Sequence, residues 1–418
     1  MPIGSGKNWR SSLEVLFVHP NFPGQFRRVA AAFTRMPGIK VFGVGDQSWI
    51  ADIAPVADVE LIAYPAPAKT AEELHPYTRS FNEAVRRGEQ VVTTLTQYKL
   101  KGLEPDVIFT HPGWGDALFL RDIFPGAKVV GLFEYYYHAR GGDLGFDPEY
   151  PSKLNDIFRL RVLNATQLMA LDCCDVGICP TQWQRSRFPA VWQNWLSVLH
   201  EGIDTDRVKP DPAMTLTLED GTVLRAGDEV LTYVSRNLEP YRGFHVFMRA
   251  LPTILAARPN CHVVIAGAWE QGYGPAAAEG TSYREQLLDE IRGRIDQSRV
   301  HFTGTLGYDN YVKLLQVSRL HVYLSYPFIL SWSMLEAMSA GCLVLGSATA
   351  PVEEVLVDGE NGLLFPFHST STLAARAIEA LANPDAYASL RQQARQTIID
   401  QYDFATVALP AYQRLLHT

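Results

Sequence analysis

The sequence predicts an α/β protein built from two doubly wound domains. The chain has 418 residues, which is too long for one ordinary hydrophobic core and suits two domains. Short, almost continuously apolar segments alternate with helical segments, a pattern typical of a parallel sheet covered by helices on both faces. The alternation stops at a proline-containing stretch near residue 200 and then starts again.

The N-terminal half opens with a strand, a glycine turn and a helix. The strand EVLFVHP is followed by the turn PNFPGQ and by FRRVAAAFTRM, whose apolar residues recur at helical spacing. Further strands are predicted at KVFGVG, DVIFTH, KVVGLFEY and DVGICP, which are residues 40–45, 106–111, 128–135 and 175–180. We therefore expect a first domain over residues 1–200.

The C-terminal half repeats this pattern after a segment, residues 197–214, that reads as a linker. A helix is predicted over residues 244–258, and the predicted strands are residues 229–235, 261–267, 300–304, 320–325 and 342–347. We expect a second domain over residues 206–400, facing the first across a central cleft. The tail from residue 384 reads as mostly helical, with a break near DQYDFATVALP.

Composition and charge exclude several classes of function. The chain is 47% hydrophobic and 20% charged, with a formal net charge of −8, so it reads as a globular protein that does not bind nucleic acid. The same charge predicts at most peripheral contact with a membrane. No apolar run has the length of a membrane span, and the first residues lack an apolar signal core, so we expect a cytoplasmic protein. The five cysteines are expected to be buried free thiols.

Three motif-like segments do not support a site. GSGKN near the start lacks the first glycine and the final Ser or Thr of a phosphate loop, and GVGDQS is a broken dinucleotide fingerprint. The DTD segment, residues 204–206, could clamp a metal ion, but its place in the linker favours a helix-capping pair of acids. We predict no metal site.

Two arginines follow the first strand of the second half, in SRNLEPYRGF. Arg236 and Arg242 bracket a turn before a helix, and ligands of such sheets bind at the carboxyl ends of the strands. Two guanidinium groups beside a helix N-terminus suit a diphosphate. The alternative is a surface salt-bridge pair.

Two later strand ends carry further candidates for the same ligand. Gly304 and Leu306 lie in a glycine-framed loop that could meet a flat base. Ser331 and Ser333 stand where a helix begins, so their amides could bind phosphate. Glu336 lies about one turn inside that helix, where it could accept two hydrogen bonds from a ribose diol. A surface glutamate is the alternative, but the apolar neighbours of Glu336 count against it.

The first half offers a candidate sugar site. Gly24 at the first strand end would allow a ligand to approach closely, or it is a plain turn glycine. The segment EYYYHARGGDLGFDPEYP is rich in tyrosines, glycines and acids, a composition suited to sugar rings. His111, Tyr135, Tyr137 and His138 are therefore predicted to bind a sugar. An ordered loop packed on the sheet is the alternative.

Several of these segments, in this order, resemble a known family over nearly the whole chain. CPTQWQRSRFP with HEGIDTDRVKP resembles the domain junction of the retaining glycosyltransferases of family 4, the glycosyl transferases group 1. SRNLEPYRGF, VHFTGTL, LEAMSAG and VEEVLVDGENGLLF resemble later motifs of the same family. The resemblance implies the GT-B fold of two Rossmann-like domains, with the final helix, residues 402–418, crossing back to the first.

The resemblance also implies an activity. It is the metal-independent transfer of a hexosyl group from a nucleoside diphosphate sugar, a UDP-sugar in the first place, with retention of anomeric configuration and no other cofactor. The acceptor would be a glycan, a lipid-linked or a small molecule in polysaccharide biosynthesis, in the cytoplasm or at the inner face of the membrane. The sugar-site residues His111, Tyr135, Tyr137 and His138 would bind this acceptor. By position, Arg236 and Arg242 would be the main electrostatic catalysts. The donor contacts implied are Gly24, Arg236, Arg242, Gly304, Leu306, Ser331, Trp332, Ser333, Leu335 and Glu336.

The chain departs from the family pattern at two positions. Phe328 stands where the first glutamate of an E-x7-E pair is expected, so the contact of that acid with the donor sugar is missing or supplied elsewhere. Glu134 stands where many members carry a histidine, with His138 four residues on. Either Glu134 or His138 could act as a catalytic group, and we favour Glu134.

Two alternatives to a transferase remain at this point. One is a catalytically degenerate GT-B protein that binds a nucleotide sugar, or a partner transferase, without turnover. Phe328 favours this alternative, whereas Arg236, Arg242 and Glu336 count against it. The other is a different GT-B enzyme, such as a nucleotide-sugar epimerase, and the family motifs argue against it.

Overall fold

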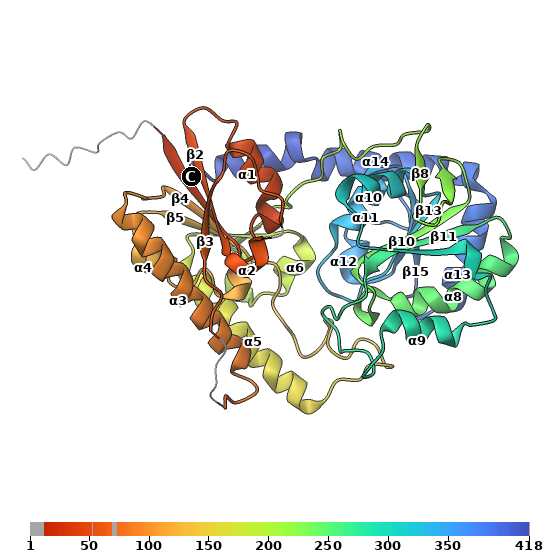
Figure 1. Cartoon of the computed structure of the whole chain (residues 1–418), viewed down its shortest axis with the longest axis horizontal. Coiled ribbons are helices and arrows are strands. Elements are labelled where there is room, and N and C mark those ends of the chain that lie inside the picture. The colour runs from red at the N-terminus through yellow and green to blue at the C-terminus, as the bar shows by residue number, and fades with distance from the viewer. Residues whose placement is uncertain (1–11, 52, 69–72, 418) are drawn as a thin grey trace, which may run out of the picture. The chain divides into compact units, whose positions relative to one another are not determined.

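The computed structural model describes residues 12–51, 53–68 and 73–417, and the GSGKN segment lies outside them. The chain forms two compact units (Figure 1). The first comprises Met1–Ala139, Ser152–Glu201 and Ala408–Thr418, and the second comprises Arg140–Pro151 and Gly202–Val407. The range expected for the first domain is therefore interrupted by a short segment, and the range expected for the final helix is divided between the units.

The first unit is built on a parallel sheet. Within the described residues its strands follow the order β3-β2-β1-β4-β5-β6-β7. They are β1 Leu13–Val18, β2 Ile39–Asp46, β3 Glu60–Tyr64, β4 Val107–Thr110, β5 Lys128–Leu132, β6 Val176–Cys179 and β7 Leu196–Val198. The reversal of order at β1 and β4 defines a doubly wound fold, because the strands on its two sides wind outward in opposite directions.

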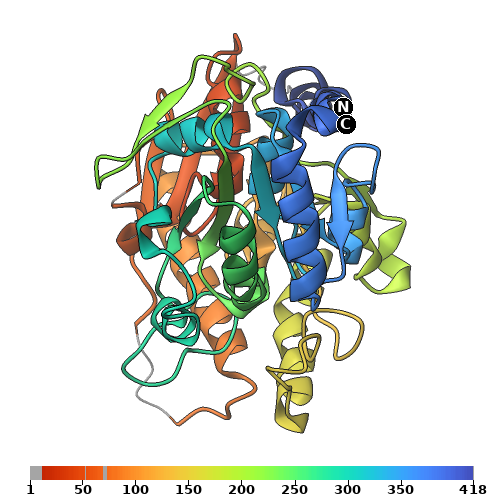
Figure 2. The ribbon, with the colours of Figure 1, turned by 90° about the vertical axis from the view of Figure 1, so that its right-hand side faces the viewer.

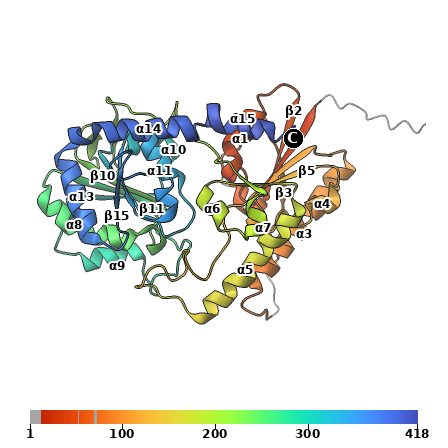
Figure 3. The same ribbon diagram turned by 180° about the vertical axis from the view of Figure 1, so that it is seen from behind.

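Helices cover both faces of this sheet, because its strands are apolar on both sides. Figure 3 shows α1 and α15 near one another, and α3, α4 and α5 together elsewhere in the unit. The bounds are α1 Arg27–Phe33, α2 Gln47–Ile50, α3 Arg79–Leu100, α4 Leu120–Ile123, α5 Leu154–Cys173, α6 Gln182–Ser186, α7 Ala190–Gln193 and α15 Leu409–Arg414. Two short 3₁₀ turns, η1 Gly24–Phe26 and η2 Pro112–Trp114, follow β1 and β4.

The second unit repeats this plan. Its parallel strands follow the order β12-β11-β10-β13-β14-β15 among the described residues. They are β10 Val230–Asn237, β11 His262–Ala268, β12 Val300–Gly304, β13 Leu320–Tyr323, β14 Leu343–Ser347 and β15 Leu363–Phe365. Two doubly wound sheets therefore confirm the predicted fold class.

The helices of the second unit lie on both faces of its sheet. In Figure 1, α8, α9 and α13 cover one face and α10, α11 and α14 the other. Their bounds are α8 Phe244–Ala257, α9 Tyr283–Glu290, α10 Tyr308–Val317, α11 Trp332–Ser339, α12 Ala350–Glu353, α13 Thr370–Ala382 and α14 Ala388–Tyr402. Short turns η3 Pro240–Arg242, η4 Gln297–Arg299 and η5 Pro384–Tyr387 complete it, and a π-helix, η6 Phe404–Ala408, occupies the predicted break near residue 404.

An antiparallel hairpin follows the linker. Strands β8 Thr215–Thr217 and β9 Val223–Arg225 pair with each other, and Figure 2 shows the hairpin at the rim of the unit. Leu216 and Leu224 pack on the sheet and on α10. Among the described residues, no helix combines the length and the apolar composition that crossing a bilayer requires.

Residues Arg140–Pro151, here called the strap, belong to the second unit although they lie between β5 and α5 in sequence. The Asp147 carboxylate is buried and accepts hydrogen bonds from His245 Nε2 and the Tyr326 hydroxyl, both at 2.9 Å. Phe146 packs on the rings of Tyr326 and Phe367. The strap is therefore anchored by a buried charge and by aromatic contacts.

Candidate functional site

A cavity of about 550 Å³ lies at the carboxyl ends of β10, β11 and β12 in the second unit. Strand ends form one side of it, and the first turns of α10 and α11 form another. It is lined by Val234, Ser235, Arg236, Asn237, Ala266, Gly267, Ala268, Gly304, Thr305, Leu306, Tyr311, Ser331, Trp332, Ser333 and Glu336. Seven of the ten residues predicted to contact the donor are among them.

Glu336 is the buried acid of this cavity, with 3% of its surface exposed. Its two carboxylate oxygens accept hydrogen bonds from the hydroxyls of Tyr308 and Tyr311, each at 2.8 Å. Burial is the largest cause that raises the pKa of Tyr311 well above its usual value, and the charge of Glu336 is the next. The hydroxyl of Tyr311 therefore stays protonated and remains a hydrogen-bond donor. Because each carboxylate oxygen has more than one lone pair, Glu336 can still accept hydrogen bonds from a ligand diol.

The N-terminus of α11 forms the wall beside Glu336. Two of its amides already have acceptors: Ser331 N–H donates to the Tyr323 hydroxyl at 2.8 Å, and Ser333 N–H donates to Ser331 Oγ at 3.3 Å. A phosphate at this helix end would compete with those bonds. Leu335, also predicted as a donor contact, has a fully buried side chain in the hydrophobic core and does not line the cavity.

The two predicted arginines differ in environment. Arg236 lines the cavity, is exposed, and makes no hydrogen bond or ion pair with a described residue. Arg242 is 7% exposed, and its Nη1 donates to Ser325 Oγ at 2.8 Å and to the Ile329 carbonyl at 2.9 Å. Arg242 therefore holds the loop between β13 and α11, while its Nε and Nη2 remain available for an anion.

Phe328 lies in this loop and is 2% exposed. Its ring centroid lies 5.6 Å from that of Tyr241 and 5.0 Å from that of Tyr273. The Arg242 guanidinium lies 5.8 Å from the Phe328 ring. Phe328 is therefore part of an aromatic cluster that lies beside the Arg242 guanidinium.

A second polar cluster lies at the strand ends of the first unit. Glu134, two residues after β5, accepts hydrogen bonds from Gln25 Nε2 at 2.7 Å and from His111 Nε2 at 3.2 Å. The ring of His111 lies 5.2 Å from that of His19, which directly follows β1. The topology therefore brings together the residues that follow β1, β4 and β5.

Charge in this cluster is set by burial and by pairing. Burial opposes ionisation of His111, but the hydrogen bond and charge of Glu134, together with the charge of Asp116, raise the pKa of His111 above its usual value. Burial likewise opposes ionisation of Glu134, and the bond and charge of His111 keep the pKa of Glu134 low. Burial and the neighbouring His111 lower the pKa of His19 to about 3, so His19 is neutral.

Gly24 also belongs to this cluster. It has a φ of +47°, and a Cβ built on it would lie 2.7 Å from the ring of His19. Glycine is therefore required here by the backbone conformation and by the packing of His19 within the first unit.

The other predicted acceptor residues have partners of their own. His138 donates from Nε2 to the Arg187 carbonyl and packs beside Tyr136. Tyr135 is buried against Trp183 and Tyr137. No hydrogen bond joins His138 to Glu134 among the described residues, so the two candidates for a catalytic group do not form a pair.

Sequence reasoning did not identify several residues of these clusters. They are His19, Gln25, Tyr308, Tyr311, Ser235 and Asn237. A signal was available for the tyrosines, because residues three apart lie on one face of a helix. In the residues that the structure describes, no group of three or more His, Cys, Asp and Glu side chains is arranged to hold a metal ion.

Two family profiles match the chain. Residues 41–208 match the glycosyl transferase family 4 group, and residues 218–397 match the glycosyl transferases group 1. The second match includes Arg236, Arg242 and Glu336.

Individual relatives are distant. Over 348 residues the chain is 25% identical to the GDP-mannose-dependent alpha-(1-6)-phosphatidylinositol monomannoside mannosyltransferase of Mycobacterium tuberculosis, covering 79% of this chain and 84% of that protein. Over 189 residues it is 28% identical to the glycogen synthase of the same species, covering 45% of this chain. That second match takes in only 42% of the length of the glycogen synthase.

Solved structures share the fold. Sucrose-phosphate synthase from Thermosynechococcus elongatus superposes with a TM-score of 0.69 at 17% identity, covering 96% of this chain and 98% of that one. Anabaena HepE in complex with UDP and glucose gives a TM-score of 0.66 at 17% identity, with 96% and 99% covered. The chain has the GT-B fold and belongs to the group 1 glycosyltransferases.

Proposed function

We propose that the protein transfers a hexosyl group from a nucleoside diphosphate sugar to a hydroxyl acceptor, with retention of configuration and without an obligatory metal or other cofactor. The observation that carries the proposal is Glu336, a buried carboxylate fixed by two tyrosines beside a helix N-terminus and an unpaired arginine. This arrangement suits a ribose diol next to a diphosphate.

In the proposed reaction the acceptor oxygen bonds to the anomeric carbon and the bond from that carbon to the β-phosphate oxygen breaks. The acceptor proton passes to the departing diphosphate. Arg236 and the free nitrogens of Arg242 stabilise the negative charge that develops there. No residue of the protein needs to form a covalent intermediate.

We assign the acceptor to the first unit, with Glu134 rather than His138 as the group that orients or polarises it. Glu134 is supported by its charge and by its two fixed hydrogen bonds, whereas His138 is held by a main-chain carbonyl. The related proteins are named for acceptors of two kinds, a glucan and a phosphatidylinositol mannoside. Both kinds are candidates here, and a lipid-linked acceptor would place the protein at the inner face of the membrane rather than free in the cytoplasm.

The donor is tested by measuring binding and hydrolysis of a panel of UDP-, GDP- and ADP-sugars. UDP-sugars are the first expectation, and a related structure contains UDP and glucose. Glu336→Gln should weaken binding of the preferred nucleotide by about 10- to 100-fold, since a hydrogen bond to a charged group contributes about 1.5–3 kcal/mol. Glu353→Gln, an exposed acid of the same unit, is the control. Equal binding by Glu336→Gln and the wild type would contradict the proposal.

A second candidate function is nucleotide-sugar binding without turnover. Phe328 favours it, because this residue stands where the resemblance leads us to expect a sugar-reading acid, and its ring packs against Tyr241 and Tyr273. Tight binding of a nucleotide sugar, with no product from any acceptor in a panel of glucans, lipid extracts and small alcohols, would support this candidate over the transferase.

A further inference from the structure

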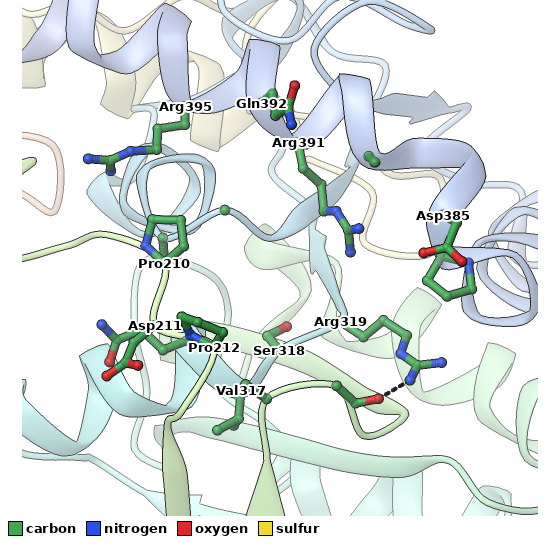
Figure 4. A pocket seen from close by; sticks show the side chains of 17 residues that line it. Pro210, Asp211, Pro212, Val317, Ser318, Arg319, Asp385, Arg391, Gln392 and Arg395 are labelled. Atoms are coloured by element: carbon green, nitrogen blue, oxygen red, sulfur yellow. Dashed lines mark hydrogen bonds between the residues drawn. The ribbon is translucent and has the colours of Figure 1, made fainter.

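A second cavity, of about 660 Å³, lies in the second unit at the opposite edge of its sheet (Figure 4). It opens where β10, β13 and β14 begin, whereas the donor cavity lies where β10, β11 and β12 end. Its lining residues are Pro210, Asp211, Pro212, Ala226, Gly227, Gln316, Val317, Ser318, Arg319, Ala340, Gly341, Pro384, Asp385, Ala388, Arg391, Gln392 and Arg395. The proposed transfer reaction uses none of them.

Three half-buried arginines give this cavity its charge. Arg319 donates to the carbonyls of Gly227 and Leu381, and Arg395 donates to those of Thr205, Val208 and Ser339. Main-chain carbonyls hold these two side chains in place, and the charges of Asp206 and Asp403 also act on Arg395.

Arg391 is the third, and it makes no hydrogen bond or ion pair with a described residue. Its side chain extends from α14 into the cavity toward Arg319, whereas Arg395 points away from both (Figure 4). A ligand with several acceptor atoms can therefore bind this guanidinium without displacing a protein partner.

The acids of the cavity do not neutralise these charges. Asp211 Oδ1 accepts a hydrogen bond from the amide of Ala213 at 2.9 Å, and Asp211 forms no ion pair with Arg319 or Arg391 among the described contacts. Asp385 is exposed and forms no ion pair with Arg319 or Arg391 among the described contacts. Much of the remaining lining is apolar, with proline, alanine and valine side chains.

We propose that this cavity is a binding site for a phosphate ester, with the phosphate on Arg391 and Arg319 and the organic part against the prolines. Guanidinium groups match the planar, multiple-acceptor geometry of phosphate. A cavity of this size accommodates a small organic body next to the anion. The ester is either a soluble metabolite or the headgroup of a lipid, and both present the same chemistry.

Isothermal titration calorimetry on the full chain, with phenyl phosphate, inorganic phosphate and phenol as probes, tests the proposal. Phenyl phosphate should bind best, because it alone combines the charge with an apolar body. Arg391→Gln should weaken its binding by about tenfold or more. Ala388→Glu, which adds a negative charge one turn away on α14 and leaves Arg391 in place, should do the same.

Two controls separate this site from the donor cavity. Arg236→Gln should leave the binding of phenyl phosphate to this cavity unchanged. This expectation does not depend on whether the protein is a transferase. Arg292→Gln, an exposed arginine paired with Asp289, reports on general charge effects. Unchanged binding in both Arg391→Gln and Ala388→Glu, or no binding to the wild type, would overturn the proposal. Sedimentation with phosphatidylglycerol vesicles that depends on Arg391 would assign the ester to a lipid, and binding to soluble esters alone would assign it to a metabolite.

Discussion

Glu336 shows how hydrogen bonds can hold a single buried carboxylate in an apolar helix. Met334, Leu335, Ala337 and Met338 around it are all buried, and an unpaired charge there would be costly. The tyrosines at positions 308 and 311 supply one donor to each oxygen. The acid is therefore stabilised before any ligand arrives, and its orientation is fixed.

Removing one of these donors should reduce stability. Tyr311→Phe deletes a hydrogen bond to a buried charge and should lower the free energy of unfolding by about 1–3 kcal/mol. Urea titration followed by circular dichroism measures this change. Tyr283→Phe is the matched control, because that hydroxyl contacts main-chain carbonyls in an exposed region. Equal stability of the two variants would show that Tyr311 contributes no net stabilisation.

The pair formed by His111 and Glu134 predicts a pH effect. His111 lowers the pKa of Glu134, against burial, so His111→Leu should let burial raise that pKa and make the carboxylate protonate at a higher pH. If Glu134 acts in its charged form, the acid limb of the pH profile of kcat/KM should move upward by about one unit or more.

Carbon NMR of labelled glutamate measures the same pKa without reference to activity. His111→Gln, which keeps a donor but loses the charge, should give an intermediate value. His138→Leu should leave Glu134 unaffected, since His138 bonds to Arg187 instead. A Glu134 pKa that is unchanged in His111→Leu would contradict this reading of the pair.

For individual residues, the sequence predicts which ones lie at the site better than it predicts which side chains they bond to. Arg236, Gly304 and Glu336 line the cavity as the motifs indicate. Leu335 does not, because consecutive helical residues point about 100° apart and its side chain faces the core. The glutamine and histidine that bond Glu134 follow different strands, and no local pattern could connect residues 25, 111 and 134.

Among the elements, the strap shows where local patterns fail. Residues 140–151 have no helical or strand periodicity, so the sequence does not predict which unit they join. Their position depends on nonlocal contacts, namely Asp147 with His245 and Tyr326 and Asp143 with Tyr241. The short strands β3 and β15 were also not predicted. Both are edge strands of only a few residues, whereas the central apolar strands were predicted in order.

The pKa of Asp147 predicts that the strap is stabilised less at low pH. Burial disfavours its charge, but hydrogen bonds from His245 and others lower the pKa of Asp147 to about 2. Since the unfolded value is about 3.9, the carboxylate adds about 2 kcal/mol of stability above pH 4, and this contribution is lost as the pH falls toward 2. Asp147→Asn should therefore be less stable than the wild type at pH 7, and the difference should shrink between pH 4 and pH 3. Urea unfolding at these values tests it, with the exposed Asp289→Asn as the control that should change little.

For the whole molecule, the main feature is that each unit is assembled from separated parts of the chain. Residues 408–418 complete the first unit, where Tyr412 packs on Phe109 at 6.0 Å between ring centroids and Lys128 Nζ donates to the Leu415 carbonyl at 2.7 Å. The doubly wound plan of both units follows from the order of apolar segments. The order of apolar segments does not predict which segments of the chain join the other unit, because their positions depend on contacts between residues far apart in sequence.

Substitution of Tyr412 tests how much residues 408–418 contribute to the stability of the protein. Its ring is 1% exposed, and its hydroxyl has no hydrogen-bond partner among the described residues. Tyr412→Ala should lower the free energy of unfolding by about 3–5 kcal/mol, the usual loss for a large buried side chain. Tyr412→Phe should be neutral or slightly stabilising, because it removes an unpaired polar atom. Differential scanning calorimetry should show this contrast, and equal losses in both variants would contradict it.

The split composition of the first unit has a consequence for synthesis in the cell. Protein synthesis proceeds at about 5–20 residues per second, so the segment that carries Tyr412 leaves the ribosome roughly 10 to 45 s after residue 201. The first sheet therefore lacks its last helix for that time. During this interval the surface around Phe109 that α15 covers is open to chaperones and to aggregation. Variants that weaken this surface should therefore reduce the yield of the protein more than the stability of the finished molecule would suggest.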